Sequence, residues 1–412
     1  MNTLHRTRTH PALLPRYVTR FNCIGADCED SCCTGWSISI DKKTFDAYCQ
    51  VQHPDLAPRL AQYVKREESQ ATEANYARIE LKPETDECPF IENHLCCIQR
   101  DLGEDHLSDI CFSYPRYSRN FGGQHEQALT LSCPEAARQA LLHPDAFDFV
   151  EATISVREDT VSQVASIHGM PPDLMNEVRI FCLQLMRAEG LELWQRLAVL
   201  GVFCESLTTT LAKEGPSAVP ALLQGFVAMV EGGMVTDALV NLQPNHQIQA
   251  GVFSVLWKSK ASKTASPVQN KVAEAIAKGL GADPVTGEVS AEQLVDGYSR
   301  GISRLPAALQ AAPWLLEHYI LNEMFREFFP FEGAAPYEHY LKIVSRFGLL
   351  RLMLAAQCNT EGMLPDAAAL VQTVHVFCRR FQHDSHFAIS VNTLFKNTGW
   401  SKLENVYSFL RS

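Results

Sequence analysis

The sequence lacks a run of apolar residues long enough to cross a membrane. No stretch approaches the ~20 consecutive apolar residues that a membrane-spanning helix needs. The first ten residues are basic, but neither an apolar core nor a small-residue cleavage site follows them, so we expect no secretory signal. We therefore expect a cytoplasmic protein without a transmembrane segment, whose cysteines stay reduced.

The chain also lacks an excess of positive charge. Its 412 residues include 36 Lys and Arg against 47 Asp and Glu, which gives a formal net charge of −11. Because phosphate binding needs clustered Lys and Arg, we expect no nucleic acid as a partner. An acidic surface suits a basic or lysine-bearing substrate, although most acidic proteins are simply soluble. The sequence is compatible with an oligomer.

Cysteine, in contrast, is abundant and unevenly distributed. Ten of the fourteen cysteines precede residue 134. All but one of these ten are clustered: Cys23, Cys28, Cys32, Cys33, Cys88, Cys96, Cys97, Cys111 and Cys133. In a reducing compartment such spacing indicates metal binding rather than disulfides. Thiolates are soft donors that select zinc, copper(I) and iron–sulfur centres.

Two pairs of adjacent cysteines, Cys32-Cys33 and Cys96-Cys97, strengthen this interpretation, because neighbours cannot share one buried face of a helix or strand. A zinc ion or a cubane cluster takes four ligands. The clustered thiols exceed that number, so either two centres form or some thiols are spare. The spacing departs from zinc ribbons and, because Cys33 directly follows Cys32, from the Cys-x3-Cys-x2-Cys signature of radical S-adenosylmethionine enzymes.

The remaining cysteines are predicted to be buried structural residues. These are Cys49, Cys182, Cys204, Cys358 and Cys378.

Secondary-structure patterns divide the chain near residues 150–170. Residues 1–150 are predicted to be irregular with short strands, since Trp36, Ile38 and Ile40 alternate with serines and Asp41 is placed to cap a helix. Other predicted strands cover 76–81 and 127–132, the latter after a turn at Gly122-Gly123. Helices are predicted over 171–185, 191–212, 217–231, 266–279, 313–329, 336–358, 366–381 and 401–411. A further helix is predicted to begin at 290, and a linker is predicted at 258–266. We predict a mainly α fold, with a small irregular cysteine-rich metal-binding domain at 1–160 and an all-helical domain at 161–412.

The order of the cysteines resembles a small bacterial family of zinc- or iron-chelating proteins, which have a Cys, Cys, Cys-Cys cluster followed by spaced single cysteines. Cys96 is extra to that pattern, and the long insertion between Cys33 and Cys88 departs from its compact members. The ligands that this resemblance implies are Cys23, Cys28, Cys32, Cys33, Cys88, Cys97, Cys111 and Cys133.

The arrangement of the whole chain resembles the flagellin lysine-N-methylases, in which such a module precedes a helical region. Residues 314–331 are similar to the C-terminal half of that family. The resemblance implies transfer of methyl groups from S-adenosylmethionine to lysine ε-amines of flagellin, with a [4Fe-4S] cluster needed for activity and zinc as the alternative metal. No Gly-x-Gly-x-Gly turn follows a predicted strand, so any cofactor site is of an unfamiliar kind.

Catalytic residues are harder to name from the sequence. Tyr114 and Arg116 follow Cys111 and are weak candidates, Tyr114 for orienting a lysine amine and Arg116 for pairing with a carboxylate. Three further sets of residues have a functional and a structural alternative. His94, His106 and His125 are metal ligands or loop residues, and Glu317, Glu323 and Glu327 form a face that attracts lysine or is merely solvated. Phe325, Phe328, Phe329 and Phe331 form a contact surface or belong to the core.

Three functions remain open at this point. The first is the methyltransferase, whether the lysine attacks the methyl group directly or a cluster takes part. The second is a non-catalytic zinc- or iron-binding adaptor or metal carrier, which the surplus of cysteines favours. The third is a helical scaffold that docks on the flagellar export machinery.

Overall fold

We obtained a computed structural model that describes residues 4–69, 71–233, 239, 242–258, 266–360, 362–383 and 385–412. The chain divides into two compact units. The N-terminal unit comprises Met1–Ala136, Asp148–Val164 and Ser262–Val268, and the helical unit comprises Ala137–Phe147, Ala165–Ala261 and Gln269–Ser412. The predicted domains, 1–160 and 161–412, stay a prediction, because compactness does not establish that either part folds alone.

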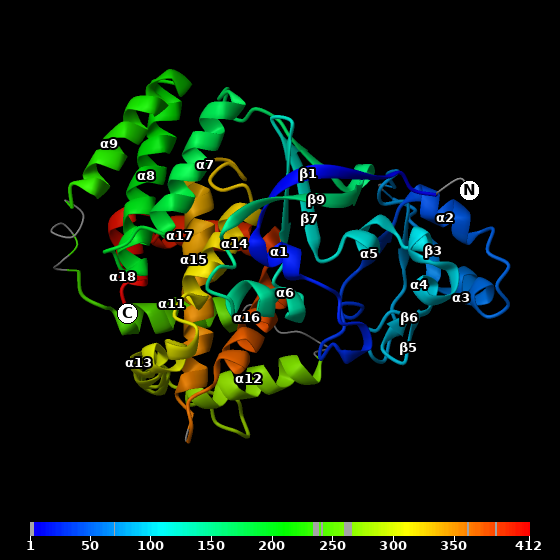
Figure 1. Cartoon of the computed structure of the whole chain (residues 1–412). Helices are drawn as coiled ribbons and strands as arrows, with labels where there is room; N and C mark the ends of the chain where they lie inside the picture. Colours follow the sequence, from blue (N-terminus) through cyan, green and yellow to red (C-terminus); the bar gives the residue numbers. More distant parts are fainter. Residues whose placement is uncertain are drawn as a thin grey trace. The chain divides into compact units, whose positions relative to one another are not determined.

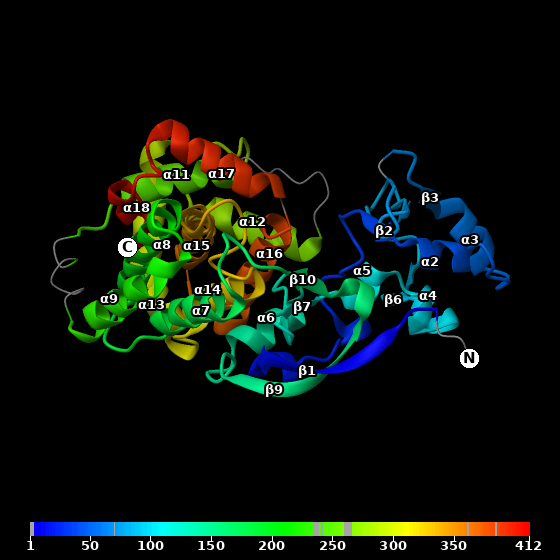
Figure 2. The same cartoon turned by 90° about the horizontal axis from the view of Figure 1, so that it is seen from above.

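The largest sheet of the N-terminal unit has five strands in the order β10-β7-β8-β1-β9. These are β1 (Thr7–Pro15), β7 (Arg116–Phe121), β8 (Gln124–Leu129), β9 (Phe149–Arg157) and β10 (Ser162–Val164). β1 and β9 pair antiparallel along their whole length and lie side by side in both views (Figures 1 and 2). The expectation of short strands only is wrong here, because β1 and β9 each have nine residues.

Two smaller sheets and several short helices complete the N-terminal unit. The three-stranded sheet has the order β2-β4-β3, and β5 pairs with β6. The strands are β2 (Ile38–Ile40), β3 (Val64–Arg66), β4 (Ala77–Ile79), β5 (Ile91–Glu92) and β6 (Leu95–Cys96). The helices are α1 (Arg16–Arg20), α2 (Lys42–Tyr48), α3 (Leu56–Tyr63), α4 (Cys97–Leu102), α5 (Asp109–Ser113) and α6 (Pro134–Leu141), of which α6 continues into the helical unit.

Several local predictions for this unit are confirmed. Asp41 caps α2 and accepts a hydrogen bond from the N–H of Thr44 at 2.9 Å. Gly122 and Gly123 take φ values of 58° and 85°, the conformation of a tight hairpin turn, and join β7 to β8. The return strand β8 begins at Gln124, earlier than the predicted start at Gln127.

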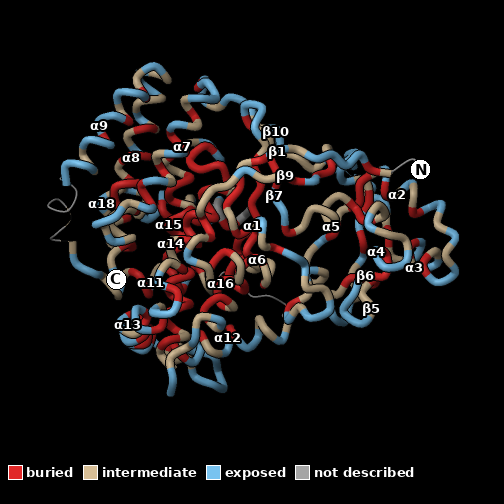
Figure 3. The backbone as a smooth tube through the Cα atoms, viewed as in Figure 1, coloured by how far each residue is buried: buried red, intermediate tan, exposed pale blue. Residues whose placement is uncertain are grey.

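The second unit is built from helices, which confirms a mainly α fold. They are α7 (Pro172–Met186), α8 (Leu193–Lys213), α9 (Val219–Glu231), α11 (His246–Lys258), α12 (Pro267–Gly279), α13 (Ala291–Ala308), α14 (Leu315–Arg326), α15 (Pro336–Cys358), α16 (Ala367–Phe381), α17 (Ser385–Thr398) and α18 (Leu403–Leu410). α15 is buried along nearly all of its length (Figure 3) and contacts α8, α11, α13, α14, α16, α17 and α18. Within the described residues, no helix is both long and apolar enough to span a membrane. Most of the predicted linker at 258–266 lies outside the described residues.

The core of the helical unit resolves two of the open alternatives. Phe325, Phe328, Phe329 and Phe331 are buried, so they belong to the core rather than to an exposed contact surface. Cys182, Cys204, Cys358 and Cys378 are fully buried, as predicted. The prediction for Cys49 is wrong: this residue follows the last turn of α2 and is exposed.

Candidate metal centre

Every cysteine predicted as a metal ligand lies in the N-terminal unit and is a free thiol. Cys23 and Cys32 are exposed, Cys88 and Cys97 are buried, and the rest are half-buried. They lie on loops or at the ends of short elements. Cys28 follows a short 3₁₀ turn (Gly25–Asp27), Cys97 begins α4, Cys111 lies in α5 and Cys133 directly precedes α6.

Backbone hydrogen bonds bring the first cysteine loop against the second. The N–H of Cys88 donates to the carbonyl of Cys33 at 2.8 Å, and the N–H of Gly35 donates to the carbonyl of Asp86 at 2.9 Å. These bonds join segments that are distant in sequence. The first and second cysteine groups therefore belong to one site.

The thiols themselves interact across this junction. The sulfurs of Cys32 and Cys33 are 3.8 Å apart. Cys33 also interacts electrostatically with Cys111 and Cys88, so three separate segments contribute to its surroundings. The same kind of interaction links Cys133 to Cys28 and Cys32, and Cys28 to Cys23. The eight predicted ligands are thus gathered in one region, with Cys97 at its edge beside Cys88 and Cys96.

Burial shifts the acidity of these thiols. It raises the pKa of Cys88, Cys111 and Cys133 to about 12, with neighbouring thiols adding to the effect. Without a metal these groups are therefore protonated at neutral pH. A bound metal has to displace the protons, as is general for thiolate sites.

Cys96 is the residue that sequence reasoning left out of the ligand set. It interacts electrostatically with Cys32, Cys88 and Cys111, so its thiol belongs to the same group. The sequence alone does not separate Cys96 from Cys97, because the direction of each side chain depends on where β6 ends and α4 begins.

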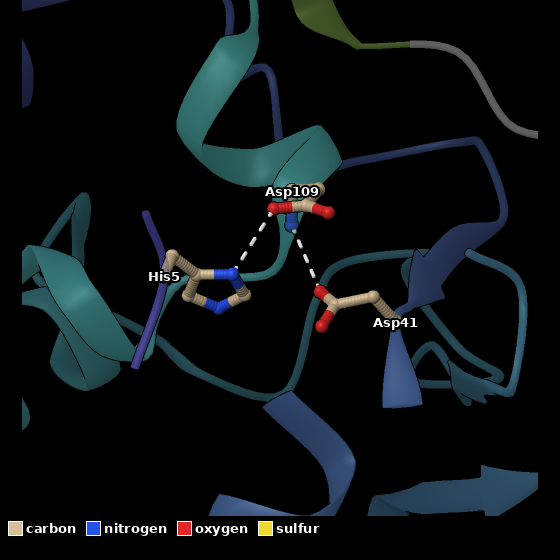
Figure 4. A group of neighbouring side chains, drawn as sticks. All are labelled: His5, Asp41 and Asp109. Atoms are coloured by element: carbon tan, nitrogen blue, oxygen red, sulfur yellow. Dashed lines mark hydrogen bonds and ion pairs between the residues drawn. The ribbon is translucent and has the colours of Figure 1, made fainter. Parts of the chain in front are cut away.

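A network of buried polar groups fixes the helix that carries Cys111. His5 Nδ1 lies 3.4 Å from Asp109 Oδ1, and the N–H of Asp109 donates to Asp41 Oδ2 at 3.2 Å (Figure 4). Arg157 Nη1 lies 3.1 Å from the same oxygen of Asp109, and His5 Nε2 lies 2.9 Å from Thr44 Oγ1. Burial lowers the pKa of His5, which favours the neutral ring. Arg157 supplies a positive charge beside Asp109, and this group of side chains holds α5 in place.

The weak catalytic candidates flank the thiol group. Tyr114 Oη lies 3.1 Å from Ser132 Oγ, next to Cys133, and the Tyr114 ring lies 6.3 Å from that of Trp36. The guanidinium of Arg116 is exposed and lies 5.2 Å from the ring of Phe21. Both residues are therefore near the cysteine loops.

The histidines near the cysteines take other positions. His94 is exposed in the turn between β5 and β6. The carbonyl of His106 accepts a hydrogen bond from Tyr48 Oη at 2.8 Å. His125 stacks on His10 in the five-stranded sheet, with 4.0 Å between ring centroids.

In the helical unit, the predicted glutamate face is not solvated. Glu323 and Glu327 are buried, and Arg346 Nη1 contacts them at 3.1 and 2.7 Å. Lys342 and Arg326 also pair with Glu327, at 2.8 and 2.6 Å. Glu317 pairs with Arg196 at 2.5 Å. These carboxylates are committed to ion pairs that join helices.

An all-sulfur donor set suits zinc and iron–sulfur centres alike. Among the described residues, the groups of three or more ligand atoms within 4.8 Å of one another contain no cysteine; they are His5, Asp41 and Asp109, and Glu327, Glu332 and His339. No three of the described thiols therefore lie within 4.8 Å of one another, although the sulfurs of Cys32 and Cys33 are 3.8 Å apart.

Comparison with known proteins shows which sequences this chain is similar to. A lysine-N-methylase of Salmonella typhimurium is 26% identical over 386 residues, which cover 91% of this chain and 92% of that protein. A lysine-N-methylase of Salmonella choleraesuis is 26% identical over 383 residues, with the same coverage. The flagellar biosynthetic protein FliU of Salmonella muenchen is 34% identical over 137 residues, 32% of this chain and 78% of that protein. No solved structure matches.

The family model of the FliB lysine N-methylase C-terminal domain matches residues 179–409, which make up more than half of the chain and, apart from Ser262–Val268, lie in the helical unit. The chain therefore belongs to the FliB lysine N-methylase family.

Proposed function

We propose that this protein is a protein-lysine N-methyltransferase that transfers methyl groups from S-adenosylmethionine to lysine ε-amines of flagellin and depends on a [4Fe-4S] cluster held by the N-terminal cysteines. The observation that carries the proposal is the gathering of free thiols from separate segments in a chain that is similar over 91% of its length to lysine-N-methylases. The flagellar name of a third relative supports flagellin as the substrate.

The transfer itself sets clear chemical requirements. The lysine nitrogen forms a bond to the methyl carbon, the carbon–sulfur bond of the sulfonium breaks, S-adenosylhomocysteine leaves and the new ammonium group releases a proton. Because only the neutral amine has a free electron pair, its pKa must fall from ~10.4, through a desolvated pocket or a nearby positive charge. Tyr114 and Arg116, beside the thiol group, are our candidates for orienting the amine and for pairing with the carboxylate of the cofactor.

The cysteines would hold the cluster, which would supply redox or Lewis-acid chemistry. The chain's own residues would fix its position. Arg157 and Asp109 hold α5 and hence Cys111, and the bond between Cys88 and Cys33 holds the two cysteine loops together.

Anaerobic purification followed by one transfer assay tests the proposal. Iron and sulfide content, the optical spectrum near ~400 nm and the Mössbauer spectrum identify the centre. Labelled S-adenosylmethionine and flagellin then report transfer. We expect four irons per cluster-bearing chain and label on flagellin lysines, with both lost on exposure to air. Zinc without iron, and no label on flagellin, would overturn the proposal.

One observation favours a second function, a non-catalytic zinc-binding adaptor. The 3.8 Å between the sulfurs of Cys32 and Cys33 matches one edge of a zinc–thiolate tetrahedron, about 4 Å for Zn–S bonds near 2.3 Å. A colourless protein that holds zinc and binds flagellin without methylating it would support this alternative.

A further inference from the structure

The adjacent cysteines Cys96 and Cys97 lie at a junction that separates their surroundings. Cys96 is the last residue of β6 and pairs with Ile91 of β5. Cys97 is the first residue of α4, and its N–H donates to the carbonyl of Phe90 at 2.9 Å. The chain changes from strand to helix between them, so the two side chains leave the backbone in different directions.

Cys97 is enclosed by the apolar core. It has no solvent-exposed surface and belongs to the same buried cluster as Phe90 and Ile98. Its largest electrostatic influences come from Arg59 and then Glu92.

Arg59 closes the Cys97 side of the junction. Its guanidinium donates to the carbonyl of Pro89 and to the carboxylate of Glu92, and lies 5.7 Å from the ring of Phe90. Arg100 pairs with Glu92 from the other side at 3.0 Å. The packed core and the ion pair of Arg59 with Glu92 therefore adjoin Cys97.

Cys96 has the opposite surroundings. It is only half-buried, and Cys32, Cys88 and Cys111 all interact with it. Among its neighbours, Leu95 is 43% exposed and lies 3.5 Å from the position that a Cβ would take on Gly25, so the loop that carries Cys23 and Cys28 approaches this strand. The interactions of Cys96 with Cys32, Cys88 and Cys111, rather than the contact of Leu95, therefore put its thiol beside the other thiols.

We propose that Cys96, and not Cys97, supplies the thiolate of this pair to the metal centre, next to Cys32, Cys88 and Cys111. The assignment rests on the proposed metal dependence of the protein, but not on its activity as a methyltransferase. It differs from the cysteine pattern of the chelating family, in which Cys97 matches and Cys96 is extra. Cys97 is then a residue of the buried core cluster that also contains Phe90 and Ile98.

The matched variants Cys96→Ala and Cys97→Ala test the assignment in the full-length chain. Alanine is chosen because it leaves no unpaired hydroxyl in the core at position 97. After anaerobic purification, we expect Cys96→Ala to lose most of the iron and sulfide and to bind metal at least about tenfold more weakly. Cys97→Ala should keep the iron content and the absorption spectrum of the wild type, although its thermal stability falls. Loss of the metal in Cys97→Ala with retention in Cys96→Ala, or retention in both, would overturn the assignment.

Cobalt(II) provides a readout that does not depend on iron. Added to the metal-free chain, cobalt gives a thiolate charge-transfer band whose intensity follows the number of bound sulfurs. The band should weaken in Cys96→Ala and stay unchanged in Cys97→Ala. If the wild type binds cobalt and zinc but never iron, the proposed iron–sulfur function fails while the ligand assignment is still decided by this band. A wild-type chain that binds none of these metals would overturn both.

Discussion

Arg157 holds α5, the helix that carries Cys111, through several buried contacts. Its fully buried guanidinium donates to the carbonyl of Leu107 at 2.7 Å and to that of Glu104 at 3.0 Å, and it lies 3.1 Å from Asp109 Oδ1. Its carbon atom Cζ is also 4.1 Å from the centre of the Phe112 ring. Removing the cation would leave two carbonyl groups and a carboxylate without their buried partner.

We therefore expect Arg157→Met to lower the free energy of unfolding of the N-terminal unit by about 3–5 kcal/mol. Denaturant titration of the metal-free protein, followed by near-UV circular dichroism, measures this change. Arg8→Met is the matched control, because Arg8 pairs with Glu158 at 2.8 Å on the surface and should contribute only about 0–1 kcal/mol. Equal effects of the two variants would contradict this account of Arg157.

At the scale of single residues, the grouping of the thiols was predictable but the directions of their side chains were not. The clustering of thiols follows from sequence spacing, whereas the side to which Cys96 or Cys97 points depends on where β6 ends and α4 begins. The burial of Glu327 was missed for a related reason. Its partners Lys342 and Arg346 come from α15, and the pattern of α14 alone resembles a solvated face.

At the scale of elements, a close contact between α13 and α15 in the helical unit depends on glycine. A Cβ added to Gly301 of α13 would lie 1.9 Å from the carbonyl oxygen of Ala355 in α15, where only backbone displacement could relieve the clash. We expect Gly301→Ala to destabilise the protein by about 1–3 kcal/mol or more, as overpacking does. Gly225 of α9 has no atom within 4 Å of that position, so Gly225→Ala should stabilise by about 0.4–1 kcal/mol.

Thermal unfolding of both variants and the wild type checks this pair of predictions. The thermal midpoint should fall in Gly301→Ala and rise in Gly225→Ala. Both substitutions add the same methyl group, and only the space around that group differs. A rise in the midpoint of Gly301→Ala would mean that α13 and α15 pack less closely than described.

Helices were predictable because their signals are local. The capping box of Ser290 and Gln293 marks the start of α13, and Asp366 caps α16, close to the predicted positions. β1 and β9 were not predicted as long strands, because each is stabilised by pairing with the other across a large separation in sequence, from Thr7 with Arg157 to Pro15 with Phe149. Pro11 within β1 also weakens the strand pattern.

At the scale of the whole molecule, acid should destabilise the helical unit through Glu327. Burial alone would raise the pKa of this carboxyl, but Arg346 and Arg326 outweigh that effect and hold it well below its usual value of 4.5. A carboxyl with a lowered folded pKa stabilises the fold above its unfolded pKa, and this stability is lost as the pH falls through the folded pKa. We expect the thermal midpoint to fall below about pH 4.5.

Comparison with Glu327→Gln isolates this contribution from that of other carboxyls. The variant should be less stable than the wild type at pH 7, by about 3–5 kcal/mol, because Arg346 and Lys342 lose their buried anion. Its stability should also depend less on pH in the acid range. A pH profile parallel to that of the wild type would show that Glu327 does not titrate with unfolding.

Metal removal should affect the two units unequally, because every clustered thiol lies in the N-terminal unit. Metal binding to sites that do not exist in the unfolded chain contributes to folding. Hydrogen exchange of the anaerobic holoprotein, before and after chelation, measures protection segment by segment. We expect faster exchange in the cysteine loops and in α4 and α5, while α13 and α15 keep their protection. Equal loss in both units would mean that the metal stabilises the whole chain, and no change would mean that the thiols hold no structural metal.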